Sequence, residues 1–467
     1  MELDNQPGTA GWWRNMLAEA LRDRRRRVGK LEDYYNGEHP LPSPPKRLEA
    51  SALAEARRAY SHLMRMGVTN WVKLVADAPS ERLEVTGFRF SGSPEADGLA
   101  WKIWQTNHLD ADAQLVHDNA LITGQSFVLV DPFMVEAGMP VITCEHSSEM
   151  IVSYVPGSRR KVAAALKMWT DSDTEYATLY LPDLIFKWQQ GADGSTSWEP
   201  RQAEGDSDWP LPNPLGEVPV REVAANRSLR PAKFGGGIGE FETVLPIQDR
   251  INKTIFDRLV TAEFQAFRQR WAVGWSPEVD PNTGLPRPDQ ILKASQSFLW
   301  TFDADPSEVK LGEFSTTDFT SFIKATEADV NAMAAISKTP PHYLLGAMVN
   351  ISGDALTAAE SGLSSKTRKH ARNFGEVWED VMRLALRVVN EDELAADMQS
   401  EVIWGDIEHR TWGEQVDAVL KMQALGVPRE ALWSRLPSVS PQDIVRWRGM
   451  TGIERLLDPS GNEDDAA

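Results

Sequence analysis

The sequence predicts an α+β protein in which a mixed α/β domain is followed by long helices, a small insert and a helical C-terminal part. Three patterns predict this class. Short β-branched and aromatic runs fill residues 125–215. Apolar residues recur at helical spacing on both sides of the loop-rich stretch 275–311. More than thirty residues of helical text follow the sharp stop at Thr339-Pro-Pro341.

Composition narrows the functional classes. The chain has 467 residues, 42% of them hydrophobic, and a formal net charge of −19. This charge argues against a protein that coats or grips nucleic acid through bulk positive charge, but it does not exclude DNA passing nearby. Cys144 is the only cysteine, so no intrachain disulfide forms. The chain lacks an uncharged apolar run of about 18 residues, and we expect no secretory signal and no membrane partner.

The N-terminal half alternates between helical and strand patterns. The predicted helices cover residues 11–31, 47–66, 68–77 and 99–121. The predicted strands cover residues 84–90, 127–130, 140–143, 162–169 and 176–188. We interpret the run Arg24–Arg27 as a solvated helix face, with contact to phosphate or to an acidic partner as the alternative.

A glycine-rich run, Phe-Gly-Gly-Gly-Ile-Gly, ends at Gly239. It looks like a dinucleotide-binding loop, but Glu240 or Glu242 stands where the third glycine of GxGxxG is needed. We interpret the run as a hinge, because glycine tolerates backbone conformations that other residues avoid.

Two long helices flank a compact insert in the second half of the chain. Apolar spacing predicts one helix over 245–271 and another over 318–338, and the insert between them holds five of the 29 prolines. A third helix runs from about Leu356 to Val389, where Ser352 or Asp354 can cap its start. The two long helices form either an intramolecular hairpin or a pair that packs against neighbouring subunits.

Motifs of catalysis are absent from the sequence. There is no GxxxxGK[ST], HExxH or GxSxG pattern, and no two histidines stand four residues apart beside a carboxylate. We therefore predict no catalytic, cofactor-binding or metal residues, and no enzyme. The alternative is a metal-dependent enzyme that processes nucleic acid through ligands that the sequence does not reveal.

The order of these segments resembles the portal proteins of tailed bacteriophages, in particular those of actinobacterial phages. The resemblance extends over most of the chain and is carried by six motifs. They are LEDYYNGEHPLP from Leu31, ALITGQ from Ala120, SKTPPHYLLG from Ser337, SGDAL from Ser352, ALGVP from Ala424 and LPSVSP from Leu436.

The resemblance implies a ring, typically of twelve subunits, at one vertex of the capsid of the virion. Its implied partners are further copies of the chain, the terminase large subunit, the major capsid protein, a head-tail adaptor and double-stranded DNA, which passes through without sequence-specific contacts. The protein would be made in the host cytoplasm, need no cofactor and serve as a conduit and docking platform.

The resemblance also implies a division of the chain into the parts of a portal subunit. These parts are a wing at 1–240, a first stem helix at 241–271, a clip at 272–315, a second stem helix at 316–338, a tunnel loop at 339–355, a long helix completing the wing at 356–392, and a crown with an acidic tail at 393–467.

Within the implied tunnel loop, the candidate channel residues are polar or apolar rather than cationic. No Lys or Arg occurs between Lys338 and Lys366. A channel that lets DNA slide should avoid cations, because each neutralised phosphate tightens binding. The candidates are His342, Tyr343, Met348, Asn350, Ser352 and Asp354. The alternative is a buried turn between helices.

A basic stretch follows on the third helix. Its candidate contact residues are Lys366, Arg368, Lys369 and Arg372, with His370 among them. Positions 366, 369 and 370 share one helix face. That face could meet DNA phosphate or an acidic surface of a neighbouring subunit, and the alternative is a solvated face.

Substitution of Asn350 by Arg tests the tunnel loop. Asn350→Arg adds one cation per subunit around the ring and should slow or stall DNA translocation, most strongly at low salt, where screening is least. The measurement is the packaging rate at several salt concentrations. A normal rate at low salt would contradict a channel that works by not binding phosphate.

Overall fold

The computed structural model describes residues 6–41, 61–90, 94–190, 197–202, 208–229, 236–266, 270–273, 281, 310–313, 318–346, 353–408, 412–428 and parts of 432–450. The chain divides into two compact units. Unit 1 comprises Met1–Tyr35, Val72–Thr243 and Ser337–Ala467, and unit 2 comprises Asn36–Trp71 and Val244–Ile336. Among the described residues, no helix combines the length and the apolar character that crossing a membrane requires.

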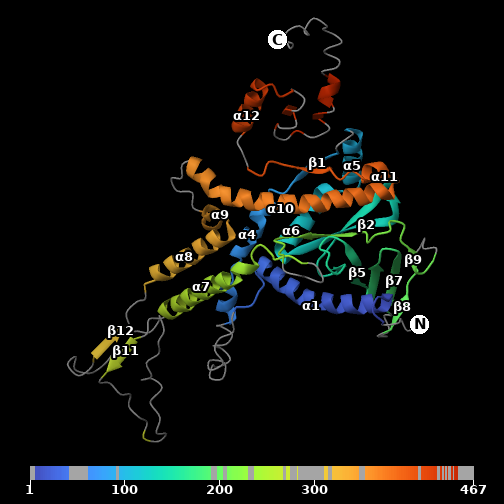
Figure 1. The fold of residues 1–467 in the computed structure, drawn as a ribbon. Helices are drawn as coiled ribbons and strands as arrows, with labels where there is room; N and C mark the ends of the chain where they lie inside the picture. Colours follow the sequence, from blue (N-terminus) through green and yellow to red (C-terminus); the bar gives the residue numbers. More distant parts are fainter. Residues whose placement is uncertain are drawn as a thin grey trace. The chain divides into compact units, whose positions relative to one another are not determined.

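Unit 1 contains most of the helices and all but two of the labelled strands (Figure 1). The helices are α1 (Ala10–Asn36), α4 (Trp71–Ser80), α5 (Pro94–Thr106), α6 (Leu109–Thr123), α9 (Pro341–Leu345), α10 (Gly353–Val388), α11 (Asp392–Ala395) and α12 (Trp412–Ala424). The strands are β1 (Val85–Arg89), β2 (Gln125–Glu136), β3 (Met139–Glu145), β4 (Met150–Tyr154), β5 (Val162–Asp171), β6 (Thr174–Tyr180), β7 (Leu184–Gln190), β8 (Trp198–Pro200), β9 (Leu211–Pro212), β10 (Val220–Ala224) and β13 (Glu401–Trp404). The predicted mixture of helix and strand is confirmed.

The strands of unit 1 form three antiparallel sheets. One has the order β10-β2-β3, and another has the order β4-β5-β6-β7-β8 with β9 paired to β7. The third pairs β1 with β13 and so joins residues more than 300 positions apart, with Arg89 opposite Glu401. Short connections explain the antiparallel pairs β2–β3 and β4 to β7, in which consecutive strands are neighbours, whereas β1–β13 and β10–β2 bring together strands that are distant in the sequence.

Aromatic side chains fill the core between α10, α6 and the β10-β2-β3 sheet. Trp104, Phe374 and Trp378 are almost completely buried, and the rings of Trp104 and Trp378 meet edge to face at 4.9 Å. Large aromatic rings bury more apolar surface than any other side chain. The predicted helix over 356–389 is confirmed as α10, whose apolar stripe faces this core.

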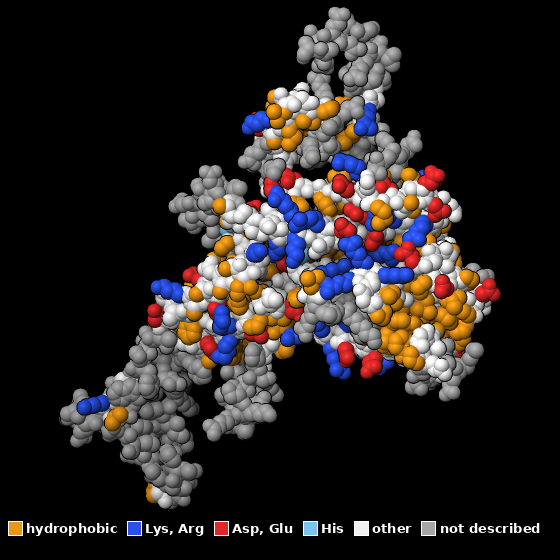
Figure 2. Space-filling view, in the orientation of Figure 1, with side chains coloured by type: hydrophobic (Ala, Val, Ile, Leu, Met, Phe, Trp, Pro, Cys, Tyr) orange, Lys and Arg blue, Asp and Glu red, His pale blue; other side chains and the backbone are white. Residues whose placement is uncertain are grey.

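A second core lies between α1 and the β4–β8 sheet, and it changes the interpretation of the arginine run. Arg24 donates to the carbonyl of Met150 at 3.2 Å, and Arg25 donates to that of Ser148 at 2.7 Å. Arg27 pairs with Glu242 at 2.5 Å. The prediction of a solvated face is therefore wrong for these three arginines, because they bind α1 to the rest of unit 1. Other Lys and Arg side chains are visible on the surface, where Figure 2 shows them gathered over the region of α1 and α10.

The glycine run is a packed crossing of backbones. A Cβ on Gly237 would lie 1.9 Å from the carbonyl oxygen of Ala225, and one on Gly239 would lie 2.3 Å from that of Ile122. The amide of Ile238 also donates to Ala225 at 3.1 Å. The hinge interpretation is wrong for residues 237–239, since glycine is needed at 237 and 239 for the close approach of backbones.

Several predicted elements differ in their bounds. The helix predicted over 99–121 is divided into α5 and α6 at His108, which has a left-handed φ of 54°. The division follows from a tertiary contact, because the Asn107 amide group hydrogen-bonds the backbone of Pro140 and Ile142. Strand β4 and the strands from β8 to β13 were not predicted, and β13 lies in the C-terminal part that was expected to be helical. The helix predicted over 47–66 lies largely outside the described residues, with 61–66 helical.

The described part of unit 2 consists mainly of two helices and a pair of antiparallel strands. Its elements are the 3₁₀ turn η1 (Glu242–Val244) at its boundary, α7 (Leu245–Ala266), β11 (Arg270–Val273), β12 (Lys310–Glu313) and α8 (Thr320–Ser337), with β11 antiparallel to β12. Arg250 on α7 pairs with Asp329 on α8 at 2.7 Å. The two predicted helices are confirmed, although α7 ends at Ala266 rather than at 271.

A buried histidine makes the stability of unit 1 dependent on pH. His117 accepts a hydrogen bond from Trp378 Nε1 at 2.9 Å, its Nδ1 faces the Leu83 carbonyl at 3.2 Å, and burial lowers its pKa to about 4. The unfolded chain takes up this proton near pH 6.5, so stability should fall between about pH 6.5 and 4, by on the order of 3 kcal/mol. Denaturant unfolding at several pH values measures this. His117→Gln should flatten that part of the profile, and an unchanged profile would assign it to other groups.

Candidate functional site

The segment that carries the predicted tunnel residues begins with a confirmed helix stop. Helix α8 ends at Ser337, Pro340 and Pro341 then open the short helix α9, and Gly346 closes it with a left-handed φ of 64°. The Gly346 amide donates to the carbonyl of His342 at 3.0 Å. The chain therefore turns within a few residues between two long helices.

Only part of the predicted tunnel loop can be placed. Met348, Asn350 and Ser352 lie outside the described residues, and Asp354 falls in the first turn of α10. His342 is buried in the single chain, and its Nε2 lies 3.7 Å from Glu360 Oε1. The roles of all six residues in the channel stay predictions.

A buried arginine joins the two flanks of this loop. The side chain of Arg82, which follows α4, is only 1% exposed. It donates to Tyr343 Oη at 2.9 Å on α9 and to Glu360 Oε2 at 3.2 Å on α10. Its other nitrogen donates to the Ile407 carbonyl at 3.3 Å. Arg82 thus fixes the last described residues before the loop and the first turns after it.

The Arg82 guanidinium and its hydrogen-bond acceptors depend on one another for their stability. A guanidinium removed from water is tolerated only when its donors find acceptors, and loss of one partner from a buried pair costs about 3–5 kcal/mol. Its planar fork can serve acceptors from several segments at once, which a lysine cannot. We infer that the flanks of the loop are rigidly held.

A second buried ionic cluster centres on Glu240. Lys366 Nζ lies 3.0 Å from Glu240 Oε2 and donates to the carbonyl of Ser337 at 2.9 Å. His370 Nε2 lies 2.6 Å from Glu240 Oε1. Burial alone would raise the pKa of Glu240, but the hydrogen bond from His370 and the charge of Lys366 lower it to about 2. Within unit 1, Lys366 therefore ties Glu240 and the backbone of Ser337 to α10.

The remaining candidates on α10 are exposed. Arg368 pairs with Glu408, while Lys369 and Arg372 point away from the core. The structure thus separates the four basic candidates into one buried lysine with an internal partner and three surface residues. Contact of the surface residues with DNA or with a neighbouring subunit stays a prediction.

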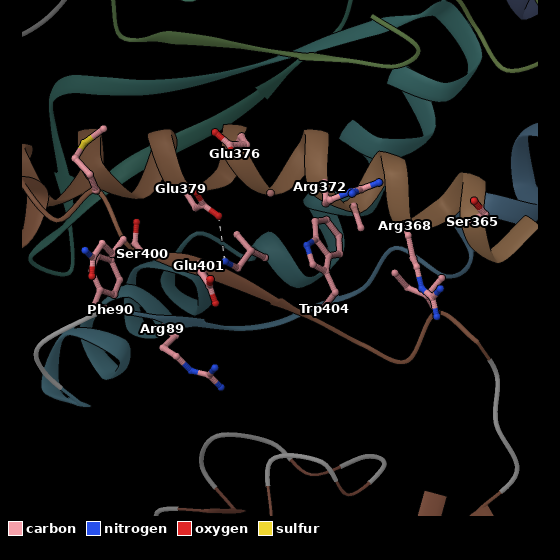
Figure 3. A pocket seen from close by; sticks show the side chains of 16 residues that line it. Arg89, Phe90, Ser365, Arg368, Arg372, Glu376, Glu379, Ser400, Glu401 and Trp404 are labelled. Carbon is pink, nitrogen blue, oxygen red and sulfur yellow. Dashed lines mark hydrogen bonds between the residues drawn. The ribbon is translucent and has the colours of Figure 1, made fainter. Parts of the chain in front are cut away.

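An open groove of about 1220 Å³ runs along the outer side of α10 (Figure 3). One wall is α10, from Ser365 to Glu379, and the other is β13 with the residues around it. Trp404 projects toward α10 between Glu379 and Arg368. Glu379 Oε1 accepts a hydrogen bond from the backbone amide of Val402 at 3.4 Å. The Glu379 carboxylate therefore lies against the edge of β13 that does not pair with β1.

Metal ligation and thiol reactivity are the two chemistries at issue for the described residues. In the part of the chain that the structure describes, no group of three or more His, Cys, Asp and Glu side chains could hold a metal ion. Burial raises the pKa of Cys144 to about 12, so its thiol is protonated at neutral pH. The ionic clusters bind parts of the chain to one another.

Comparison with known families decides the identity. The family model described as "Phage portal protein, SPP1 Gp6-like" matches residues 16–454. The chain belongs to this portal protein family. The portal protein of Mycobacterium phage D29 is 29% identical over 435 residues, which cover 89% of this chain and 84% of the relative. The portal protein of Mycobacterium phage L5 is also 29% identical, with 89% and 83% covered.

Solved structures give a weaker likeness. A chain in the neck of an empty GTA particle has a TM-score of 0.45 and 13% identity, covering 82% of this portal chain and 94% of that chain. A chain in the virion of a native gene transfer agent particle has a TM-score of 0.44 and 11% identity, with 86% and 96% covered.

Sequence reasoning missed Arg82 and Glu240. A single arginine between a helix and a strand belongs to no motif, and in the sequence Glu240 stands out only as a residue that breaks a glycine pattern. One signal was available for Glu240. It follows a glycine run directly, and such runs often bring backbones close enough to bury the next side chain.

Charge reversal separates the buried lysine from its exposed neighbour. Lys366→Glu places a second carboxylate beside Glu240 and should destabilise unit 1 by about 3 kcal/mol or more. Lys369→Glu changes an exposed side chain and should cost less than about 0.5 kcal/mol. Thermal unfolding of the two variants measures the contrast. Equal midpoints would show that the Glu240 cluster does not stabilise the fold.

Proposed function

We propose that this chain forms a closed ring of twelve subunits at one vertex of a phage capsid, and that double-stranded DNA passes through its channel. The observation that carries the proposal is the match of the portal family model to residues 16–454. The protein acts as a conduit and a docking platform rather than as a catalyst.

The exposed surface of unit 2 supports assembly. Ile323 and Ile336 on α8 are large apolar side chains exposed in the single chain. Helices that leave apolar residues uncovered gain stability by packing against a neighbour. In a cyclic ring each such contact joins different surfaces of two subunits, and closure of the ring prevents an open filament.

The tunnel loop is proposed to lie at the narrowest part of the channel. Its flanks are held by Arg82 through Tyr343 and Glu360, so a loop fixed at both ends would keep one radius around the ring. The lack of Lys and Arg between Lys338 and Lys366 suits DNA that slides.

The proposed partners follow from the portal role. The terminase large subunit and the head-tail adaptor would dock at the clip, 272–315, where prolines can fix the shape of surface loops. The major capsid protein would surround the wing. The chain would be made in the host cytoplasm and incorporated into the virion at the portal vertex.

Electron microscopy of the purified full-length protein tests the ring. The expected images are closed rings with a central channel, which are resistant to dilution because every subunit has two neighbours. Incubation with DNA and magnesium is the control and should give no cleavage. A monomer that cleaves DNA would replace this proposal with a metal-dependent enzyme.

A further inference from the structure

Helix α12 leaves an apolar surface uncovered in the single chain. Val416 and Val419 are half-buried, while Leu420 is 56% exposed and Leu425, just beyond the helix, is 84% exposed. Positions 416, 419 and 420 share one face of the helix. An amphipathic helix in this state is suited to docking against another surface.

The groove along α10 offers a complementary surface. Its floor contains Ala371, Gly375 and the indole of Trp404, and Met398 beside them is 77% exposed. Gly375 is covered by Trp404, since a Cβ there would lie 3.4 Å from the indole Nε1, so Trp404 and Met398 supply the apolar surface of the groove. Trp and Met are enriched where proteins bind one another.

Charges at the two surfaces match in spacing and sign. Arg372 and Glu376 are exposed one helical turn apart on α10. Asp417 and Lys421 are one turn apart on α12, largely exposed, and paired with each other at 3.3 Å. If α12 lies parallel to α10, Asp417 meets Arg372 and Lys421 meets Glu376, because both pairs are separated by about 6 Å along their helices.

We propose that α12 of one subunit docks in the α10 groove of a second copy of this chain. The inference rests on the proposed ring and assigns one of its contacts. A second copy is the occupant that the structure favours, because the chain carries both surfaces and leaves both exposed among its described residues. Such a contact between unlike surfaces has the form that a cyclic ring repeats.

Charge exchange tests the alignment. The groove variant Arg372→Glu with Glu376→Lys, and the helix variant Asp417→Lys with Lys421→Glu, should each weaken subunit association about tenfold at low salt. The four substitutions together restore complementary pairs and should recover association to within about threefold. Analytical ultracentrifugation of the full-length proteins measures this. Failure of the combined variant to recover would overturn the proposed contact.

Two matched substitutions test the apolar part. Leu420→Glu should reduce the fraction of assembled rings, whereas Leu229→Glu, at another exposed leucine of unit 1, should not. Because Leu420 is exposed in the single chain, its replacement should leave the subunit folded, as circular dichroism can verify. Equal assembly of the two variants would contradict docking through this face.

Cysteine pairing distinguishes a neighbouring copy from the same chain. Glu376→Cys with Lys421→Cys should form disulfides between subunits on oxidation and give a ladder of linked subunits on a denaturing gel. Background reaction should be slow, because Cys144 is partly buried and its pKa is raised. A single intrachain product would show that α12 docks in its own groove. If the unmodified protein forms no ring, the proposed function itself fails.

Discussion

The paired carboxylate of Glu240 is the interaction on which the organisation of unit 1 depends. It lies between a backbone crossing and the start of α7, and it is nearly buried. A buried charge is tolerable only with partners, and Lys366 and His370 supply them from α10. The glycines at 237 and 239 are required for the same reason, since only residues without a Cβ let the chain pass close enough to place this carboxylate.

Helix α10 makes different contacts on three of its faces. One face buries Phe374 and Trp378 in the aromatic core, a second carries Lys366 and His370 toward Glu240, and a third borders the open groove with Arg372. Few helices remain ordered over 36 residues by propensity alone, and this one is held by tertiary contacts along its length. A substitution that shifts α10 on one face therefore also displaces the residues on its other two faces, because the helix moves as a rigid element.

The sequence predicted those features of the fold that depend on local sequence patterns. The extents of α1, α8 and α10 follow from apolar spacing and from the prolines after Lys338, and these elements were found. The division between α5 and α6 depends on contacts of Asn107 with β3, which no local pattern contains. The partners of Arg82 are 261 to 325 positions away, so its burial follows only from the assembled fold. Of the candidate site, the sequence located the turn at 339–346 but not the cluster that holds it.

The arginine run on α1 shows why basic residues overstate the positive surface of this chain. Arg24, Arg25 and Arg27 appear in the sequence as a cationic stripe, but their donors are directed to backbone carbonyls and to Glu242. Burial even lowers the pKa of Arg24 to about 10, which is the cost of bringing a cation into this packing. Lys366 repeats the pattern on α10. Cations that secure tertiary structure cannot also bind phosphate, so a chain with a net charge of −19 has fewer free cations than its composition implies.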